Sequence, residues 1–396
     1  MVNPSPTPLV ETFPVALDQY TLLERLATGG MADVYLAIER HHAGGLRWIA
    51  VKRVRGDLVD HPEFLEYFAT EGRVSLACRH PHLPTAYHLG RSGRRPYLAL
   101  EYIPGPTVLS AQRAASRRRR PIAVPAVVAI AMAAARALEH LHGLTDVSGQ
   151  PLRVIHRDVT PQNLLIGPGG VVKLIDFGVA RAAVQTHRTQ VGVIKGKYAY
   201  IAPEQLDRER VVDQRADLFS LGTVIHELLT LEPLFHGPSD LATTERVRTA
   251  PIPDPSRINP DVPPAIAEVI LTALARDPDR RWPSASALVE ALERAVEQAG
   301  LWPWPSRLAR EVAALCGPPR LPALTGDTVT WSASLPPPSP DDGDDAVTPV
   351  IEVRSDGGGW ELEPRVAADP QLSYFLQAGA VDKPWQGGDS TDVSEG

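Results

Sequence analysis

Segment 154–165 constrains most tightly what this chain can fold into. It carries Asp158 and Asn163 in an H-R-D-x-x-x-x-N pattern. This spacing places a proton acceptor and a metal ligand on one short loop. Thirteen residues after Asn163 comes Asp176-Phe177-Gly178, which follows the apolar run 171–175. The two motifs in this order predict a site for phosphoryl transfer, in which Asp158 orients an acceptor hydroxyl and takes its proton.

Two of these side chains are the predicted metal ligands. Asn163 would hold Mg²⁺, and Asp176 would bridge the metal to the β- and γ-phosphates of ATP. Oxygen ligands of this kind suit Mg²⁺, with Mn²⁺ as the alternative. The motifs therefore predict ATP and Mg²⁺ as cofactors.

Two charged residues further upstream extend the predicted phosphate site. Lys52 ends the strand-like run 49–51 and would reach the α- and β-phosphates. Glu71 lies in the helical pattern of residues 62–79 and would pair with Lys52, which fixes the lysine rotamer. Singly, each residue would be read as an ordinary surface charge. Their order ahead of both motifs favours the functional interpretation.

A glycine-containing turn between two strand-like segments is a weaker signal. Segment 26–35 departs from the usual phosphate-covering pattern G-x-G-x-x-G-x-V, because Ala27 and Ala32 replace the first and third glycines and only Gly29 matches. Alone, the segment would be read as a plain hairpin. Beside the other motifs, its backbone amides are expected over the phosphates, with Val34 as an apolar lid on the adenine.

Residues 20 to about 300 resemble a bacterial Hanks-type serine/threonine protein kinase over the whole fold. The resemblance implies an α+β fold with a small β-rich N-lobe and a larger α-helical C-lobe. Strand-like patterns followed by helical ones agree with this. It also implies transfer of the γ-phosphoryl group of Mg-ATP to protein substrates, autophosphorylation, and a role in bacterial signal transduction.

The same resemblance assigns the nucleotide site. Glu101 and Ile103 fall on the hinge, where backbone groups would bond adenine, and Leu100 falls at the gatekeeper position. The expected nucleotide-binding residues are Leu26, Gly29, Gly30, Val34, Ala50, Lys52, Glu101, Ile103 and Leu165.

Further positions implied by the resemblance concern the protein substrate. Segment 202–204 resembles the end of the activation segment, and Arg281 matches the ion-pair partner of Glu204. Asp217 would hold the catalytic loop from a buried helix. Such a platform suits extended protein substrates and disfavours a small-molecule phosphotransferase.

Two departures from the family pattern occupy positions that face each other in the family. Thr160 stands where a lysine is usual, and Lys197 stands where a threonine is usual. We hypothesise an exchange, in which Lys197 supplies the ammonium group and Thr160 the hydroxyl. The alternative is a simple loss of the lysine, with Lys197 in solvent. A charge-assisted hydrogen bond is worth roughly 1.5–3 kcal/mol, so an uncompensated loss would slow the reaction and would weaken the distinction between serine/threonine and tyrosine acceptors.

A pseudokinase or scaffold is the main competing interpretation. The altered glycine turn and Thr160 support it, whereas the retained metal ligands oppose it, because a scaffold has no physical need for them. If the chain is active, Thr186 and Thr189 are candidate phosphorylation sites on the activation segment, with Arg157 as cationic partner. An unmodified loop is the alternative.

Composition sets the remaining expectations. We expect a leader at residues 1–18, the kinase domain at 19–300, a short helix within 301–317 and a disordered tail at 318–396 rich in Pro and Asp. The tail has a net charge of −10 and the whole chain −7, so the remainder is about +3 by subtraction. A near-neutral body gives no reason to expect nucleic acid, while the acidic tail suggests a protein partner.

Location was predicted from three features. The chain has two cysteines, Cys78 and Cys316, which argue against a disulfide framework and fit a reducing cytosol. The N-terminus lacks the basic start and apolar block of a secretory signal. The longest apolar stretch, 122–135, is too short for a membrane span. These features predict a cytoplasmic protein.

Overall fold

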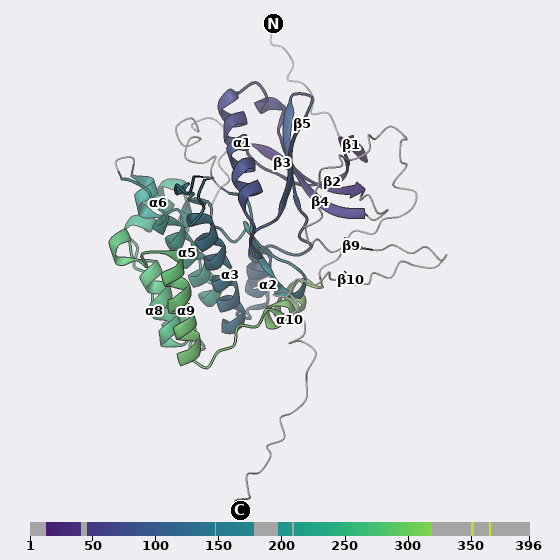
Figure 1. Ribbon diagram of the computed structural model, residues 1–396. Coiled ribbons are helices and arrows are strands. Elements are labelled where there is room, and N and C mark those ends of the chain that lie inside the picture. Colours follow the sequence, from purple (N-terminus) through teal and green to yellow (C-terminus); the bar gives the residue numbers. More distant parts are fainter. Residues whose placement is uncertain are drawn as a thin grey trace, which may run out of the picture. The chain divides into compact units, whose positions relative to one another are not determined.

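The structure is a computed structural model that describes residues 13–40, 46–146, 148–177, 197–207, 210–318, 350–351 and 364–365. The chain divides into two compact units, one of residues 1–39 and 48–337 and one of residues 40–47 and 338–396. The motifs of the predicted site all belong to the first unit, which contains a β-rich lobe and a helical lobe (Figure 1).

The β-rich lobe is built on antiparallel strands. Alternating burial along the strands places Tyr20, Tyr35 and Tyr97 on a buried face, where Tyr20 and Tyr97 meet edge to face at 6.0 Å. In sheet order the strands are β1 (Val15–Leu17), β2 (Tyr20–Thr28), β3 (Ala32–Arg40), β4 (Leu46–Val54), β6 (Arg95–Glu101) and β5 (Ala86–Ser92).

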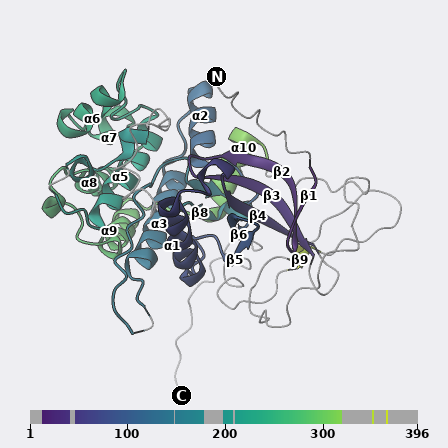
Figure 2. The ribbon, with the colours of Figure 1, turned by 90° about the horizontal axis from the view of Figure 1, so that it is seen from above.

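One helix, α1 (Pro62–Ala77), packs against β5 and β6 (Figure 2). Pro62 at its first position is a favourable helix start, because a proline there loses no helical hydrogen bond. Phe68 on its inner face joins Val54 and Leu98 of the sheet in one buried cluster. This packing sets the position of Glu71, which lies on the same buried side of α1.

The helical lobe follows the sheet. A two-stranded ribbon, β7 (Leu164–Ile166) and β8 (Val172–Leu174), joined by the 3₁₀ turn η2 (Pro168–Gly170), carries the ends of the two motifs. The α-helices are α2 (Val108–Arg118), α3 (Val124–His142), α5 (Arg215–Thr230), α6 (Asp240–Thr249), α7 (Pro255–Ile258), α8 (Pro264–Ala273), α9 (Ala285–Gln298) and α10 (Pro305–Cys316). Further 3₁₀ turns are η1 (Gly56–Leu58), η4 (Lys197–Tyr200), η5 (Pro203–Leu206) and η6 (Pro278–Arg280).

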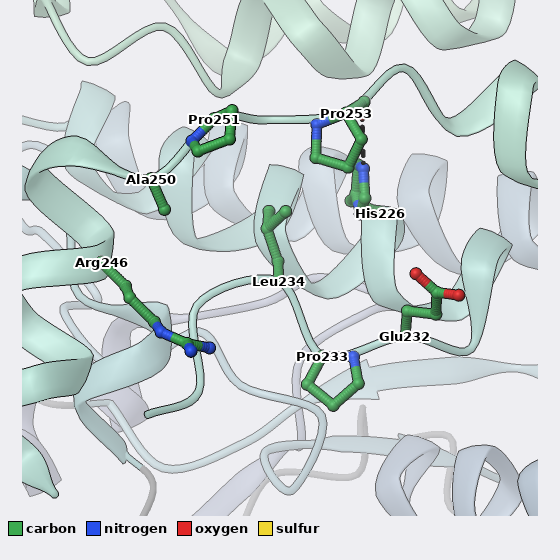
Figure 3. A pocket seen from close by; sticks show the side chains of 8 residues that line it. All are labelled: His226, Glu232, Pro233, Leu234, Arg246, Ala250, Pro251 and Pro253. Carbon is green, nitrogen blue, oxygen red and sulfur yellow. Dashed lines mark hydrogen bonds between the residues drawn. The ribbon is translucent and has the colours of Figure 1, made fainter. Parts of the chain in front are cut away.

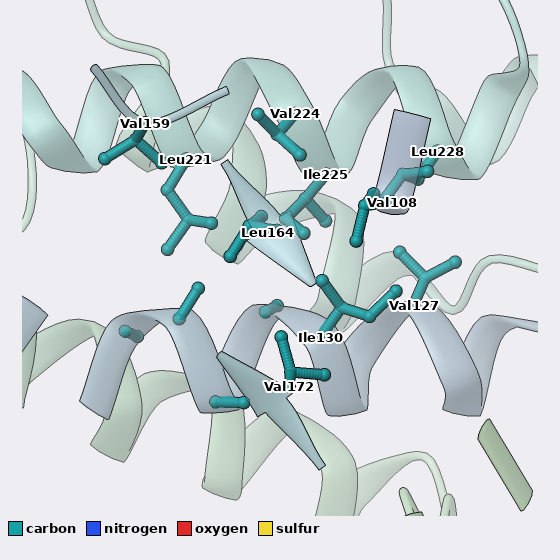
Figure 4. Packing of buried hydrophobic residues seen from close by; sticks show 14 of the residues in the cluster. Val108, Val127, Ile130, Val159, Leu164, Val172, Leu221, Val224, Ile225 and Leu228 are labelled. Carbon is teal, nitrogen blue, oxygen red and sulfur yellow. The ribbon is translucent and has the colours of Figure 1, made fainter. Parts of the chain in front are cut away.

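The core of this lobe lies between α3 and α5. Val127 and Ile130 of α3 and Val224 of α5 belong to one buried cluster with Leu164 and Val172 of the ribbon (Figure 4). The catalytic loop therefore leads into strands that are anchored in the largest apolar cluster of the molecule. That anchoring gives the loop a rigid base.

By length and composition, α3 is the one described helix that could cross a membrane. Most of its apolar window, 72%, is buried inside the lobe, as in the core helix of a soluble protein. The apolar stretch predicted from the sequence ends before Arg136, whereas the helix itself continues to His142.

The last helix of the lobe belongs to its core. Ser284 caps α9 by accepting a hydrogen bond from the Ala287 amide, as the sequence predicted. Leu308, Val312 and Leu315 of α10 join the main buried cluster, and α10 packs against α2, α3 and η2. Burial of each such side chain contributes about 1.5–3 kcal/mol. The compact unit thus continues past the expected domain end at residue 300.

In the second unit, β9 (Val350–Ile351) and β10 (Pro364–Arg365) pair antiparallel. The rest of the tail, the leader up to residue 12 and the segment 178–196 lie outside the described residues. The expectations for the tail, Gly178, Thr186 and Thr189 therefore stay predictions.

Candidate active site

Lys52 is the centre of the predicted phosphate site. Its Nζ donates to Glu71 Oε1 at 2.5 Å and to Asp176 Oδ1 at 2.9 Å. These three residues come from β4, α1 and the segment after β8, and the structure brings them together as predicted. The ammonium group therefore lies between the helix of the β-rich lobe and the predicted metal ligand.

The charges of this cluster are strongly coupled. Burial lowers the pKa of Lys52, but the carboxylates of Asp176 and Glu71 outweigh it and raise this pKa above its usual value. For Glu71, burial raises the pKa, and Lys52 acts against it. The lysine is thus held as a cation in a partly dehydrated site, which is the state needed to bind phosphate oxygens.

The catalytic loop is held by its own hydrogen bonds. Asn163 Nδ2 donates to the Asp158 carbonyl at 2.8 Å, and the Ile175 amide donates to the Asn163 carbonyl at 2.8 Å. Because the amide nitrogen of Asn163 is used in this way, its Oδ1 is the atom suited to bind a cation. The second bond ties the loop to the residue before Asp176.

Asp217 on α5 holds the start of the same loop. Its carboxylate accepts from the backbone amides of His156 and Arg157, both at 2.8 Å, and from His142 Nε2 at 2.9 Å. Burial raises the pKa of Asp217, but the bonds from His142 and His156 outweigh it and lower this pKa. The role given to Asp217 by resemblance agrees with these contacts. His142 was missed, because in the sequence it is only the last residue of a helix.

Backbone strain marks the two motifs. Arg157 and Asp176 have φ angles of 61° and 58°, in the left-handed region that non-glycine residues seldom adopt. Such conformations cost free energy and persist where the surrounding contacts enforce them, often at functional sites. Both residues adjoin groups with assigned roles in phosphoryl transfer.

Thr160 is the most informative departure from the family pattern. Its side chain is 3% exposed, and within the described residues its hydroxyl has no hydrogen-bond partner. Buried hydroxyls are nearly always paired, so this one suits a group from substrate, nucleotide or an undescribed side chain. The backbone of Lys197 begins η4, but its side chain lies outside the described residues. The proposed exchange stays a hypothesis.

The glycine turn joins β2 to β3. The Gly29 amide donates to the Ala32 carbonyl at 2.9 Å, and a Cβ on Gly29 would lie 2.9 Å from that oxygen, so a side chain there would force a shift. Gly29 is therefore required by the turn itself. Leu26 at the end of β2 is 43% exposed, as expected for a residue that a nucleotide would cover.

The hinge residues follow β6. Ala50 pairs with Leu100 and Ile49 with Glu101, which places the predicted gatekeeper beside the predicted adenine contact Ala50. Leu165 on β7 forms a bridge with Thr107 just after the hinge. The carboxylate of Glu101 bonds to other protein groups, so the backbone is the part of this residue that adenine would use.

The expected substrate platform is rigid. Arg281 Nη1 and Nη2 donate to the two carboxylate oxygens of Glu204 at 2.6 and 2.7 Å. The Tyr200 hydroxyl donates to Glu227 at 2.7 Å, and the Leu234 amide donates to the other oxygen of Glu227 at 2.9 Å. The pairing of Glu204 with Arg281 agrees with the resemblance.

A cavity of about 300 Å³ lies next to this network (Figure 3). None of its lining residues is a predicted ATP-site residue. They are His226, Glu232, Pro233, Leu234, Arg246, Ala250, Pro251 and Pro253.

The residues present fit Mg²⁺ bound together with nucleotide. In the described part of the chain there is no group of three or more His, Cys, Asp or Glu side chains that could hold a metal alone. Mg²⁺ commonly binds through one or two protein ligands plus substrate phosphates. Asn163 and Asp176 supply that small number, and Lys52 supplies a cation for the phosphates.

Comparison with known proteins decides the family. The description "protein kinase domain" matches residues 20–292. The chain belongs to the protein kinase family. Its fold agrees with this, because the kinase domain of Mycobacterium tuberculosis PknI aligns with 73% of this chain and all of that chain, at a TM-score of 0.53 and 26% identity.

Two curated kinases are similar over the same region. The tyrosine-protein kinase MasK of Myxococcus xanthus is 38% identical over 274 residues, which cover 69% of this chain and 42% of MasK. The serine/threonine-protein kinase PknB of Mycolicibacterium smegmatis is 38% identical over 290 residues, covering 71% of this chain and 43% of PknB. The match thus spans less than half the length of these relatives.

Proposed function

We propose that this chain is a serine/threonine protein kinase that transfers the γ-phosphoryl group of Mg-ATP to protein hydroxyls, its own included, in bacterial signalling. The observation that carries the proposal is the Lys52 ammonium group bound to both Glu71 and Asp176, a cation fixed beside a metal ligand. Mg²⁺, when bound, would offset the phosphate charge.

Each protein group has one task in this proposal. Lys52 holds the α- and β-phosphates, and Glu71 fixes the lysine rotamer. Asp158 orients the acceptor hydroxyl and takes its proton, on a loop fixed by Asp217. Preorganised groups of this kind lower the barrier because they need little rearrangement in the transition state.

The acceptor class rests on relatives. PknB and similar chains from mycobacteria and Streptomyces coelicolor carry serine/threonine-kinase names, which supports serine and threonine. Tyrosine is the second candidate, because MasK is named a tyrosine kinase and Thr160 replaces a lysine typical of the serine/threonine class. A scaffold is disfavoured by the bonded Lys52, Glu71 and Asp176.

A labelling experiment tests the proposal. The purified chain is incubated with ATP labelled at the γ-phosphate and Mg²⁺, beside Lys52→Met and Asp158→Asn, and the modified amino acids are identified. We expect phosphoserine or phosphothreonine in the wild type and little label in either variant. Phosphotyrosine would favour the second candidate, and absence of label on itself and on a generic protein substrate would favour a scaffold.

The metal, the location and the tail complete the proposal. Mg²⁺ is preferred over Mn²⁺, and replacing one by the other in the labelling reaction tests this. Both cysteines are free thiols, which supports a reducing cytosol. The net charge of −10 on residues 318–396 supports a basic protein partner, whose binding should weaken steeply with salt.

A further inference from the structure

A lysine outside the predicted site joins the two lobes behind the hinge. Lys173 lies on β8, and its side chain is 12% exposed. Its Nζ donates to Glu101 Oε2 at 2.6 Å and to the Leu83 carbonyl at 3.1 Å. A lysine is seldom buried this far without a specific partner.

The partner of this lysine is the hinge residue whose backbone would bond adenine. Glu101 Oε2 also accepts from the Thr85 amide at 3.0 Å, and the Glu101 amide donates to the Thr85 carbonyl at 2.8 Å. Glu101 is thus held at its backbone by one segment and at its carboxylate by that segment and Lys173. The main chain of Glu101 is oriented by these three bonds.

The strand that carries Lys173 leads directly to the metal ligand. Asp176 lies three residues further on. Between them, the Leu174 amide donates to the His82 carbonyl at 2.9 Å and the Ile175 amide to the Asn163 carbonyl at 2.8 Å. Lys173 therefore connects the adenine end of the expected nucleotide site to the strand that presents its metal end.

We propose that Lys173 is a positioning residue that acts through Glu101 and sets the hinge backbone at the distance from Asp176 that one bound Mg-ATP spans. This inference rests on the proposed nucleotide binding. Lys173 does not itself contact the nucleotide. Its effect is on how well the hinge is placed before the nucleotide arrives, so it should appear mainly in nucleotide affinity.

The size of the effect follows from the type of bond. A hydrogen bond between two ionised groups that are largely shielded from water is among the stronger ones in proteins. Removing the lysine leaves the Glu101 carboxylate with one donor and lets the hinge rotate. We expect Mg-ADP to bind about tenfold more weakly to Lys173→Met.

The test compares Lys173→Met, Glu101→Gln, their double variant and Lys173→Arg in the full chain. Calorimetry with Mg-ADP gives the dissociation constant, and steady-state kinetics give KM for ATP and kcat. We expect each single variant to lose about tenfold in affinity with a smaller change in kcat, and the double variant to lose no more than either. Lys173→Arg should recover most of the affinity, because it keeps a donor for Glu101.

Arg294→Met is the matched control. It breaks the exposed pair of Arg294 with Glu290 on α9, whose atoms lie 3.7 Å apart, and should bind Mg-ADP as the wild type does. The thermal midpoint of every variant is measured with and without nucleotide, so that a loss of folding is recognised. Glu101→Gln, which keeps the shape of the side chain, carries the test if Lys173→Met does not fold.

Three results would overturn the inference: additive losses in the double variant, a wild-type affinity in Lys173→Met, or a raised kcat in Lys173→Met. The last would mean that Lys173 restrains the enzyme. These outcomes differ from a failure of the proposed function, in which the wild type itself would not bind Mg-ADP.

Discussion

The ion pair of Lys52 with Glu71 and that of Arg281 with Glu204 lie in different lobes and differ in how fully their atoms are bonded. Arg281 donates to both Glu204 oxygens and to the carbonyls of Arg215, Ala275 and Arg276, and its side chain is 0% exposed. Lys52 bonds to two carboxylates, one of which, Asp176, has a side chain that is 41% exposed.

The difference shows which pair can change partners. All three guanidinium nitrogens of Arg281 are bonded inside the protein, so this pair can only support structure. Lys52 shares one ammonium group between a buried and an accessible carboxylate, so it can turn to a phosphate without leaving a buried charge alone. The first pair should therefore govern stability and the second the rate.

The largest expected effect is on the closed pair. Arg281→Met leaves Glu204 buried without its cation, and breaking such a pair costs about 3–5 kcal/mol of unfolding free energy. Urea unfolding measures it, with Arg294→Met as the control. If Arg281→Met lost activity but kept its stability, the pair would be functional, and the comparison between the two pairs would be wrong.

The next effect is on the open pair. Lys52→Met removes one preorganised donor from the phosphates, which should lower the rate of phosphoryl transfer about 10²–10³-fold. Its unfolding free energy should change far less than that of Arg281→Met, because Glu71 can take up a proton. Initial rates at saturating ATP and a urea curve on the same preparation decide this, and a stability loss equal to that of Arg281→Met would contradict it.

A pH titration sharpens the comparison. Burial raises the pKa of Glu71 above its usual 4.5, and Lys52 opposes this. A carboxyl whose pKa is raised on folding stabilises the protein below its unfolded value, and this is lost as pH rises through the folded value. Without Lys52 that loss should grow by about 1–2 kcal/mol, since one pKa unit equals about 1.36 kcal/mol.

The measurement is the urea midpoint of Lys52→Met and of the wild type between pH 4.5 and pH 7.5, where 4.5 is the usual pKa of Glu71. The variant should lose more stability with rising pH than the wild type does. Adding Glu71→Gln to Lys52→Met should remove the extra slope. Equal slopes in all three proteins would show that Glu71 is not the responsible group.

The smallest effect is on an exposed pair. Arg136 Nη2 lies 2.8 Å from Glu293 Oε1, with side chains 42% and 48% exposed. Solvent screening limits such pairs to about 0–1 kcal/mol, so Arg136→Met should leave both the unfolding free energy and the rate close to those of the wild type. A loss as large as that of Arg281→Met would mean that burial is not what separates these pairs.

Most of the candidate site was predictable because its motifs are local. Asp158 and Asn163 lie five residues apart on one loop, so their spacing alone carries the chemistry. Lys52 and Glu71 were predicted from their order in the chain, and the short distances between them agree. Ser284 was recognised as a cap because a helix N-terminus has a local side-chain preference.

Other features depend on contacts between distant segments. Nothing local marks His142 as a partner of Asp217, 75 residues away, or Lys173 as a partner of Glu101, 72 residues away. The packing of α10 on η2 was likewise invisible, although a helix near 306–315 was expected. The Cβ position of Gly170 would lie 1.9 Å from the Pro305 carbonyl, a close approach that only the folded chain reveals.

The sequence by itself determined the chemistry of this protein, because a proton acceptor, two metal ligands and a phosphate-binding cation must appear as particular residue types in a particular order. The tertiary structure decided which charges are open and which are closed. Lys52 and Arg281 are both cations paired with a glutamate, and only their burial and their remaining hydrogen bonds separate a group that can bind phosphate from one that holds the fold.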